Sequence, residues 1–160
     1  MSKVYAISDL HIGHEKVANL RGFRTNDQHT NHMISQWNSI ITKRDVVYIL
    51  GDIALHKKYY PILNKLKGIK KVILGNHDDP KDVPELLKYV SSVAGMFKYK
   101  NNILTHAPIH PDEMNRHGYD RNVHGHTHDR SIDDHRYLNV CFEKSHGMPV
   151  ELKEYNIFVE

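Results

Sequence analysis

The feature of this sequence that most constrains its fold is a series of short apolar runs, each followed at once by polar residues. The runs cover residues 4–7, 46–50, 72–74 and 103–104, and a weaker one ends at Val123. Short runs that are apolar throughout are typical of strands buried on both faces. Because helical patterns separate several of these runs, we expect an α/β fold whose sheet is largely parallel at its start.

Three helices are expected between the runs. The first covers about residues 27–41 and starts where Thr25 and Gln28 have the spacing of a capping box. The second covers residues 61–67, begins with a proline and ends before a glycine. The third runs from residue 84 to about residue 90.

The C-terminal third departs from this alternation. Residues 137–142 and 155–159 resemble strands with no helix between them, so we expect antiparallel pairing there. Residues 108–121 are rich in Pro, His, Arg and Asp and are expected to form a long irregular loop.

Polar residues with metal-ligating side chains follow the predicted strands. They are Asp9 and His11, Asp52, then Asn76, His77 and Asp78, then His106, and finally His126 and His128. Because ligands bind at the carboxyl ends of strands in α/β sheets, we expect these side chains to meet at one edge. Gly51, Gly75 and Gly125 precede three of the groups and would let the chain turn sharply. Imidazole, carboxylate and amide groups without a thiolate argue against a structural zinc site.

This ordered set of motifs resembles the calcineurin-like metallophosphoesterase superfamily, in the small single-domain form found in microbes and viruses. The motifs are Asp-x-His, Gly-Asp, Gly-Asn-His-Asp, a single His and Gly-His-x-His, and they span residues 8–128. The resemblance implies a layered α/β/β/α sandwich with two central mixed sheets. It also implies one calcineurin-like phosphoesterase domain over residues 1–160.

The resemblance further implies a binuclear metal centre. The first ion would be held by Asp9, His11, Asp52 and His128, and the second by Asp52, Asn76, His106 and His126, with Asp52 bridging the two. Mn²⁺ or Fe is favoured by the mixed nitrogen and oxygen ligands, and Zn²⁺ or Ni²⁺ would also fit. A metal-bridging hydroxide would attack phosphorus, while His77 would face the leaving group and donate a proton to it. Asp78 is expected to orient His77.

The implied activity is metal-dependent hydrolysis of phosphate esters, with phosphodiesters favoured over monoesters. Protein phosphatases of this superfamily carry an arginine after Gly-Asp and a glutamate after Asn-His, whereas this chain has no arginine at residues 53–56 and has Asp78 in place of the glutamate. A phosphomonoesterase or phosphoprotein phosphatase is the alternative within the enzymes. A non-catalytic metal-binding scaffold is another alternative, but such relatives usually lack the histidine that His77 represents.

Three further residues are candidate substrate contacts. His14 follows His11 by three positions and would either line the substrate site or cap a turn. Arg116 and Arg121 lie in the predicted loop, and guanidinium groups match phosphate oxygens bidentately, although a solvated loop is an equal alternative. His124 is expected on the same side of its strand as His126, where it would support a metal-bound histidine.

The remaining composition narrows the setting. The formal net charge of +3 is too small to indicate nucleic-acid binding by charge, and it counts against a metal-stabilised nucleic-acid-binding module. Cys141 is the only cysteine, so no internal disulfide can form. We find no pattern of a signal peptide or membrane span and expect a cytoplasmic protein without an obligate protein partner. Its expected partner is a phosphate-ester substrate, with nucleotides and nucleic-acid ends among the candidates.

Overall fold

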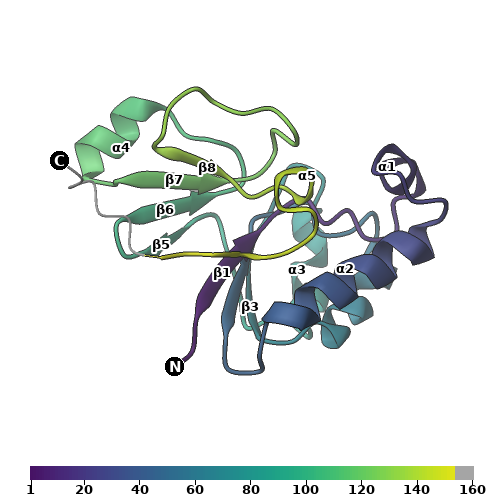
Figure 1. The fold of residues 1–160 in the computed structure, drawn as a ribbon. Coiled ribbons are helices and arrows are strands. Elements are labelled where there is room, and N and C mark those ends of the chain that lie inside the picture. Colours follow the sequence, from purple (N-terminus) through teal and green to yellow (C-terminus); the bar gives the residue numbers. More distant parts are fainter. Residues whose placement is uncertain (154–160) are drawn as a thin grey trace.

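A computed structural model describes residues 1–153, in which strands and helices build two sheets (Figure 1). The strands are β1 (Val4–Ile7), β2 (Val46–Ile49), β3 (Ile69–Ile73), β4 (Ser92–Ala94), β5 (Phe97–Tyr99), β6 (Asn102–Thr105), β7 (Arg121–His124), β8 (Tyr137–Asn139) and β9 (Val150–Glu151). The helices are α1 (Glu15–Leu20), α2 (Asn26–Ile40), α3 (Val83–Leu86), α4 (Pro111–His117) and α5 (Phe142–Ser145), with 3₁₀ helices η1 (Lys57–Lys65) and η2 (Pro80–Asp82).

Both sheets are mixed, as predicted. The first has the strand order β4-β3-β2-β1-β9, in which β1 to β4 are parallel and β9 is antiparallel to β1. The second has the order β5-β6-β7-β8, in which only β5 is antiparallel. Figure 1 shows α2 and α3 beyond the first sheet and α4 beyond the second. The predicted α/β class with two central mixed sheets is confirmed.

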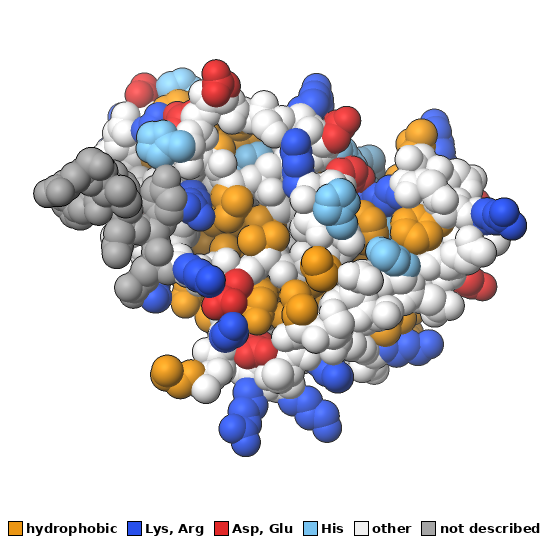
Figure 2. Space-filling view, viewed as in Figure 1, with side chains coloured by type: hydrophobic (Ala, Val, Ile, Leu, Met, Phe, Trp, Pro, Cys, Tyr) orange, Lys and Arg blue, Asp and Glu red, His pale blue; other side chains and the backbone are white. Residues whose placement is uncertain are grey.

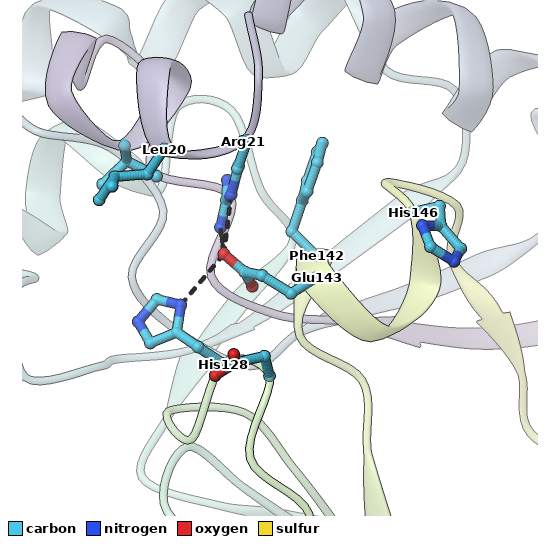
Figure 3. A pocket seen from close by; sticks show the side chains of 8 residues that line it. Leu20, Arg21, His128, Phe142, Glu143 and His146 are labelled. Carbon is cyan, nitrogen blue, oxygen red and sulfur yellow. Dashed lines mark hydrogen bonds and ion pairs between the residues drawn. The ribbon is translucent and has the colours of Figure 1, made fainter.

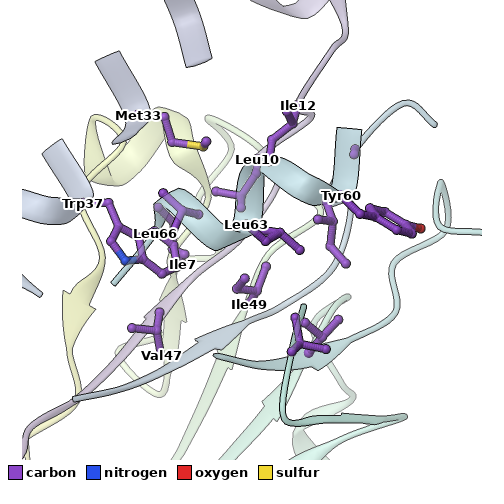
Figure 4. Close-up of a cluster of buried hydrophobic side chains, with 14 of the residues drawn as sticks. Ile7, Leu10, Ile12, Met33, Trp37, Val47, Ile49, Tyr60, Leu63 and Leu66 are labelled. Carbon is purple, nitrogen blue, oxygen red and sulfur yellow. The ribbon is translucent and has the colours of Figure 1, made fainter. Parts of the chain in front are cut away.

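The alternation of side chains along β1 and β2 builds two hydrophobic cores. Val47 and Ile49 face α2 and η1, where the large core also contains Trp37 (Figure 4). Tyr48 and Ala6 point to the opposite face and pack against the second sheet. Because successive strand residues point to opposite faces, a strand buried on both sides reads as the continuous apolar run seen in the sequence.

The predicted helix between the first two strands is confirmed as α2. The side chain of Thr25 accepts a hydrogen bond from the N–H of Gln28, and the side chain of Gln28 accepts one from the N–H of Arg24. Trp37 is fully buried and donates from its ring nitrogen to the carbonyl of Lys67 at 2.8 Å. The apolar stripe of α2 therefore packs against one face of the first sheet, and the capping box fixes where the helix begins.

Two other predicted helices differ in form. Residues 57–65 form the 3₁₀ helix η1 instead of an α-helix over residues 61–67, because Pro61 lies inside the segment and has no N–H for the helical ladder. The third helix, α3, covers only Val83–Leu86, and the following N–H groups of Lys88 and Tyr89 bond to carbonyls three residues back. Helices α1 and α5 and strands β4, β5 and β9 were not predicted.

The prediction of an irregular loop over residues 108–121 is wrong, because α4 lies within it. His110 caps the helix by accepting from the N–H of Asp112, Pro111 occupies the first position, and Gly118 ends the helix at a φ of 66°. These are ordinary start and stop signals that a count of polar residues had obscured. Among the described residues, no helix is long and apolar enough to cross a membrane.

The prediction that no helix follows the strand over residues 137–142 is wrong. Strand β8 pairs parallel to β7, and the chain then turns into α5. A parallel pair needs a crossover connection, and residues 125–136 supply one without a helix. The second predicted C-terminal strand, residues 155–159, lies outside the described residues, so its antiparallel pairing with residues 137–142 stays a prediction.

Candidate metal centre

The predicted ligands converge in two adjoining clusters. Ligand atoms of Asp9, His11 and His128 all lie within 4.8 Å of one another, and so do those of Asp9, Asp52 and His106. These residues follow β1, β2, β6 and β7, whose carboxyl ends meet as the topology requires. Two clusters that share a carboxylate are consistent with a binuclear metal site.

The first cluster leaves two buried polar atoms without hydrogen bonds. Oδ1 of Asp9 lies 3.7 Å from Nε2 of His11 and 3.7 Å from Nε2 of His128. Neither that oxygen nor Nε2 of His11 has a hydrogen-bond partner among the described residues. Buried polar atoms are nearly always paired, and a divalent cation between these atoms would satisfy both. The residues present therefore fit a metal ion.

The other oxygen of Asp9 is held by the protein itself. Oδ2 accepts hydrogen bonds from the N–H of His126 at 2.9 Å and from Sγ of Cys141 at 3.3 Å. Burial alone would raise the pKa of Asp9, but these bonds and the contacts with His11 and Ser8 outweigh it and hold the pKa well below its usual range. The carboxylate is therefore charged at neutral pH, as a metal ligand must be.

Asp52 belongs to the second cluster and also lies close to a member of the first, whereas Asp9 is the carboxylate that both clusters contain. Its Oδ2 is 3.6 Å from Nε2 of His11, and its Oδ1 is 3.6 Å from Nε2 of His106. Oδ1 also accepts a hydrogen bond from the backbone N–H of His77 at 3.0 Å. The side chain is 2% exposed, so its carboxylate oxygens face these neighbours and not solvent.

In the second cluster, acceptor atoms face each other. Nδ1 of His106 lies 2.6 Å from the carbonyl oxygen of Leu50, which can only accept, so this nitrogen carries the proton. In a neutral ring the Nε2 atom then has a lone pair, yet it lies 2.9 Å from Oδ1 of Asn76. Nδ1 of His126 lies 3.0 Å from the same oxygen. The lone pair of His106 Nε2 facing an amide oxygen suits a bound cation, and the mixed nitrogen and oxygen set suits a divalent one.

The backbone at the predicted ligands has an unusual conformation. A left-handed φ, between 48° and 67°, occurs at Asp9, His11, Asp52, His126 and His128. Among the other described non-glycine residues, only Lys100 and His146 share it. A left-handed conformation costs an L-residue about 1–2 kcal/mol. Such strain gathers at functional sites, where the surrounding structure holds it in place.

The three motif glycines have two different functions. Gly51 has a φ of 95° and supports the sharp turn that the sequence predicts. Gly75 and Gly125 are needed for close approach, because a Cβ atom at Gly75 would collide with Oδ1 of Asp52 and one at Gly125 with Asp9. The carboxylates therefore reach their positions only because two neighbouring residues have no side chain.

His77 and Asp78 lie in different environments. The His77 side chain is 65% exposed and its Nε2 is 4.0 Å from Oδ2 of Asp52, so the ring stands at the mouth of the site. The Asp78 carboxylate is buried and accepts from the backbone N–H groups of Asp52, Ile53 and Gly75. Burial raises the pKa of Asp78, and its effect exceeds that of these hydrogen bonds, which lower the pKa. Its oxygens are directed at the backbone of two motif loops and not at the His77 ring.

The predicted substrate contacts divide into two groups. His14 caps α1 through a bond from the N–H of Val17, and its ring lies 5.9 Å from that of His11, at the edge of the cluster. Arg116 lies on α4 and Arg121 begins β7, whereas His126 follows the other end of that strand. The structure therefore does not bring the two arginines to the cluster.

His124, predicted to support His126, is fully buried, and its Nδ1 lies 2.9 Å from the carbonyl of Gly125. Burial lowers its pKa. The polar contact of His124 is thus with the backbone next to His126 and not with the His126 ring. The support of His126 by His124 stays a prediction.

Two residues at the site were not predicted from the sequence. Oε1 of Glu143 lies 3.2 Å from Nδ1 of His128 and accepts a hydrogen bond from Nε of Arg21 at 2.8 Å. Glu143 directly follows the apolar run that ends at residue 142, the same pattern as at the other strand ends, and could have been found by it. Arg21 follows no such run, and we find no sequence signal for it.

A cavity of ≈ 520 Å³ opens beside His128 (Figure 3). It lies between α1, α5 and the loop after β7, and its lining is formed by Val17, Leu20, Arg21, His128, Asp129, Phe142, Glu143 and His146. Figure 3 shows Glu143 between Arg21 and His128 in its wall. A cavity of this size can accommodate a small organic group.

Two relatives match most of the chain. An uncharacterised protein of Methanocaldococcus jannaschii, MJ1445, is 30% identical over 97% of this chain and 85% of its own length. The gene 66 protein of Mycobacterium phage D29 is 35% identical over 82% of this chain and 81% of its own length. No family model matches the sequence.

Two solved structures share the fold. A protein of unknown function from Aquifex aeolicus, AQ665, superposes with a TM-score of 0.74 at 24% identity, covering 94% of this chain and 96% of that chain. An archaeal phosphodiesterase superposes with a TM-score of 0.54 at 20% identity, covering 86% of this chain and 82% of that chain. The chain therefore belongs to the same family as the archaeal and phage relatives and shares the fold of the two solved structures, and the His/Asp clusters at the strand ends agree with its resemblance to the calcineurin-like metallophosphoesterases.

Proposed function

We propose that the protein hydrolyses phosphate esters, with phosphodiesters preferred, using two divalent metal ions. The observation that carries this proposal is the pair of buried, unpartnered atoms, Oδ1 of Asp9 and Nε2 of His11, in a cluster that adjoins a second one. A purely structural cluster would pair these atoms with each other or with the backbone.

The chain offers a complete set of ligands for both ions. Asp9, His11, Asp52 and His128 would hold the first ion, and Asp52, Asn76, His106 and His126 would hold the second. Two ions bound there would supply positive charge to the phosphate oxygens and lower the pKa of a water molecule toward neutrality. Fixed backbone turns keep the donors in place before the ions arrive, which reduces the reorganisation that binding requires.

His77 is suited to act on the leaving group. Its ring is exposed at the mouth of the site, while its backbone N–H is fixed by Oδ1 of Asp52. An imidazole has a pKa near neutrality and can donate a proton to a departing oxygen. Asp78 would position His77 indirectly, because its carboxylate connects the loop that carries His77 to the loop that carries Asp52.

Two features favour a diester over a monoester. The cavity beside His128 provides space for a second ester substituent. A monoester dianion also carries an additional negative charge, which phosphatases commonly meet with an arginine. Among the described residues, Arg21 is the arginine that lines this cavity, and its guanidinium is engaged by Glu143 and by backbone carbonyls.

The test is to strip the protein of metal, add Mn²⁺, and measure hydrolysis of bis-p-nitrophenyl phosphate and p-nitrophenyl phosphate side by side. We expect turnover only with added metal, and a higher kcat/KM for the diester. Titration with Fe²⁺, Zn²⁺ and Ni²⁺ then ranks the ions. Binding of two ions without turnover of either ester would reject the enzyme and favour the scaffold.

A further inference from the structure

Arg21 is a charged side chain buried next to the cluster. Its side chain is 5% exposed. Nη2 donates to the carbonyl of Asp9 at 2.7 Å, and Nη1 donates to the carbonyl of Leu10 at 3.1 Å. The guanidinium carbon also lies 4.2 Å from the centre of the Phe142 ring. Burying a cation costs free energy unless the cation is fully paired. The contacts of the Arg21 guanidinium supply this pairing and hold the side chain in one position.

The partner of Arg21 connects it to a predicted ligand. Both Nε and Nη2 of Arg21 lie 2.8 Å from Oε1 of Glu143. The same oxygen lies 3.2 Å from Nδ1 of His128. A carboxylate only accepts, so Nδ1 of His128 carries the proton and its Nε2 presents a lone pair toward Asp9.

Arg21 therefore reaches the first cluster by two routes. One passes through Glu143 to His128, and the other runs directly to the backbone oxygen of Asp9. Asp9 has a φ of 59°, and a strained turn persists only where its surroundings hold it. The Arg21 guanidinium thus contacts both the turn at Asp9 and Glu143, whose carboxylate contacts His128.

We propose that Arg21 and Glu143 are positioning residues of the metal centre, and this inference rests on the proposed function. Glu143 holds the tautomer and direction of His128, and Arg21 holds Glu143 and the turn at Asp9. Such outer partners of metal-bound histidines orient the ring and increase its basicity. Both residues line the cavity beside His128, and they reach the cluster through the His128 ring and the Asp9 backbone.

A different account is that the pair only stabilises the fold. The two accounts predict different results, because a purely stabilising pair affects the unfolding temperature and not the ion affinity of the folded protein. The surface ion pair between Lys3 and Glu151, 2.9 Å apart and distant from both clusters, is a matched control.

The experiment compares Glu143→Ala, Glu143→Gln, Glu143→Asp and Arg21→Lys with the control Glu151→Gln. Mn²⁺ affinity is measured by calorimetry on the metal-stripped full chain, and Co²⁺ absorption spectra report the ligand geometry. We expect Glu143→Ala and Arg21→Lys to weaken one Mn²⁺ site by roughly 10–100-fold and to change the Co²⁺ spectrum. Glu143→Asp should recover part of the affinity, and Glu151→Gln should equal the wild type.

Circular dichroism of each metal-free variant shows whether it is folded. If Glu143→Ala does not fold, Glu143→Gln decides, because it keeps the shape and an acceptor oxygen and loses only the charge. Wild-type affinity and an unchanged Co²⁺ spectrum in the folded variants would overturn the inference and leave the proposed function intact. A wild-type protein that binds no Mn²⁺ would overturn both.

Discussion

Nδ1 of His106 lies 2.6 Å from the carbonyl oxygen of Leu50, although 56 residues separate them. Leu50 directly follows β2, and His106 directly follows β6, so this bond joins the two sheets at the edge where the clusters lie. It also determines the tautomer of the ring, since only Nδ1 can carry the proton. The Nε2 atom is thereby aimed at Asn76 and Asp52.

Replacing His106 with Gln should remove one ion and leave the other. The amide can still reach the carbonyl of Leu50 but cannot offer a ring nitrogen to the second cluster. We expect the Mn²⁺ stoichiometry to fall from two to one, with a loss of turnover of at least about 10²-fold. Calorimetry and elemental analysis measure this; two tightly bound ions would remove His106 from the ligand set.

His77→Ala should bind both ions normally and turn over slowly. The ring is exposed and is not part of either ligand cluster, so its loss should affect the leaving group alone. The expected fall in kcat is about 10²–10⁴-fold, the usual contribution of a general acid. The loss should be smaller for esters whose leaving group needs no proton. Full activity toward a poor leaving group would exclude the assigned role.

Gly125→Ala should damage the site more than the fold. Its Cβ would collide with Oγ of Ser8 and approach Oδ2 of Asp9, and overpacking of this kind typically costs about 1–3 kcal/mol. We expect a lower free energy of unfolding in urea together with weaker Mn²⁺ binding. The control is Gly95→Ala, where a Cβ meets nothing within 4 Å. Equal effects of the two substitutions would contradict this explanation.

Stability should fall as the pH is lowered through the range in which His29 titrates in the unfolded chain. Burial, followed by the charge of Arg21, lowers the pKa of His29 from 6.5 to about 4. Between these values the unfolded chain binds a proton and the folded protein does not, so stability rises with pH in this window. The full difference corresponds to about 3 kcal/mol at this fully buried residue.

The measurement is urea unfolding of the metal-free protein at several pH values between 4 and 7, for the wild type and for His29→Gln. The glutamine can still accept from Nη1 of Arg21, which lies 3.0 Å from the His29 ring nitrogen. We expect the variant to lose most of the slope in this window. An identical slope in the two proteins would show that other groups cause it.

Leu20→Asp should lower activity toward diesters with large apolar substituents. Leu20 lines the cavity beside His128 and is 78% exposed, so the change should not disturb the core. We expect kcat/KM for an aryl diester to fall by roughly 10-fold, with little change for a methyl diester. Leu87→Asp is the control, since Leu87 is 47% exposed and does not line the cavity. Equal losses for both substrates would exclude the cavity as a substituent site.

The surface drawn in Figure 2 shows basic side chains interspersed with acidic and uncharged ones. On this face, therefore, the charge pattern does not indicate a second binding site for a phosphate ester.

Much of this protein could be predicted from local patterns. Strands β1, β2 and β3 are visible in the sequence because both of their faces are buried, and α2 is visible because its cap and apolar stripe lie close together. The polar residues that follow the strands could be assigned to one edge because parallel strands end together. Helix α4 has the same kinds of local signal, a capping residue, a proline at its first position and a glycine at its end, but they lie in a polar segment whose composition is also typical of loops.

Other features depend on contacts between segments far apart in the chain. Glu143 supports His128 through a contact across 15 residues, and Arg21 reaches Glu143 across 122. The left-handed turns at Asp9 and Asp52 are unfavourable for those residues taken alone and exist only because surrounding groups hold them. The sequence by itself determined which residues could serve as ligands and at which edge of the sheet they would lie, because residue type and strand periodicity are local. Only the tertiary structure decided which oxygen faces which imidazole, which tautomer each ring adopts and which distant side chains hold them, because those are properties of packing.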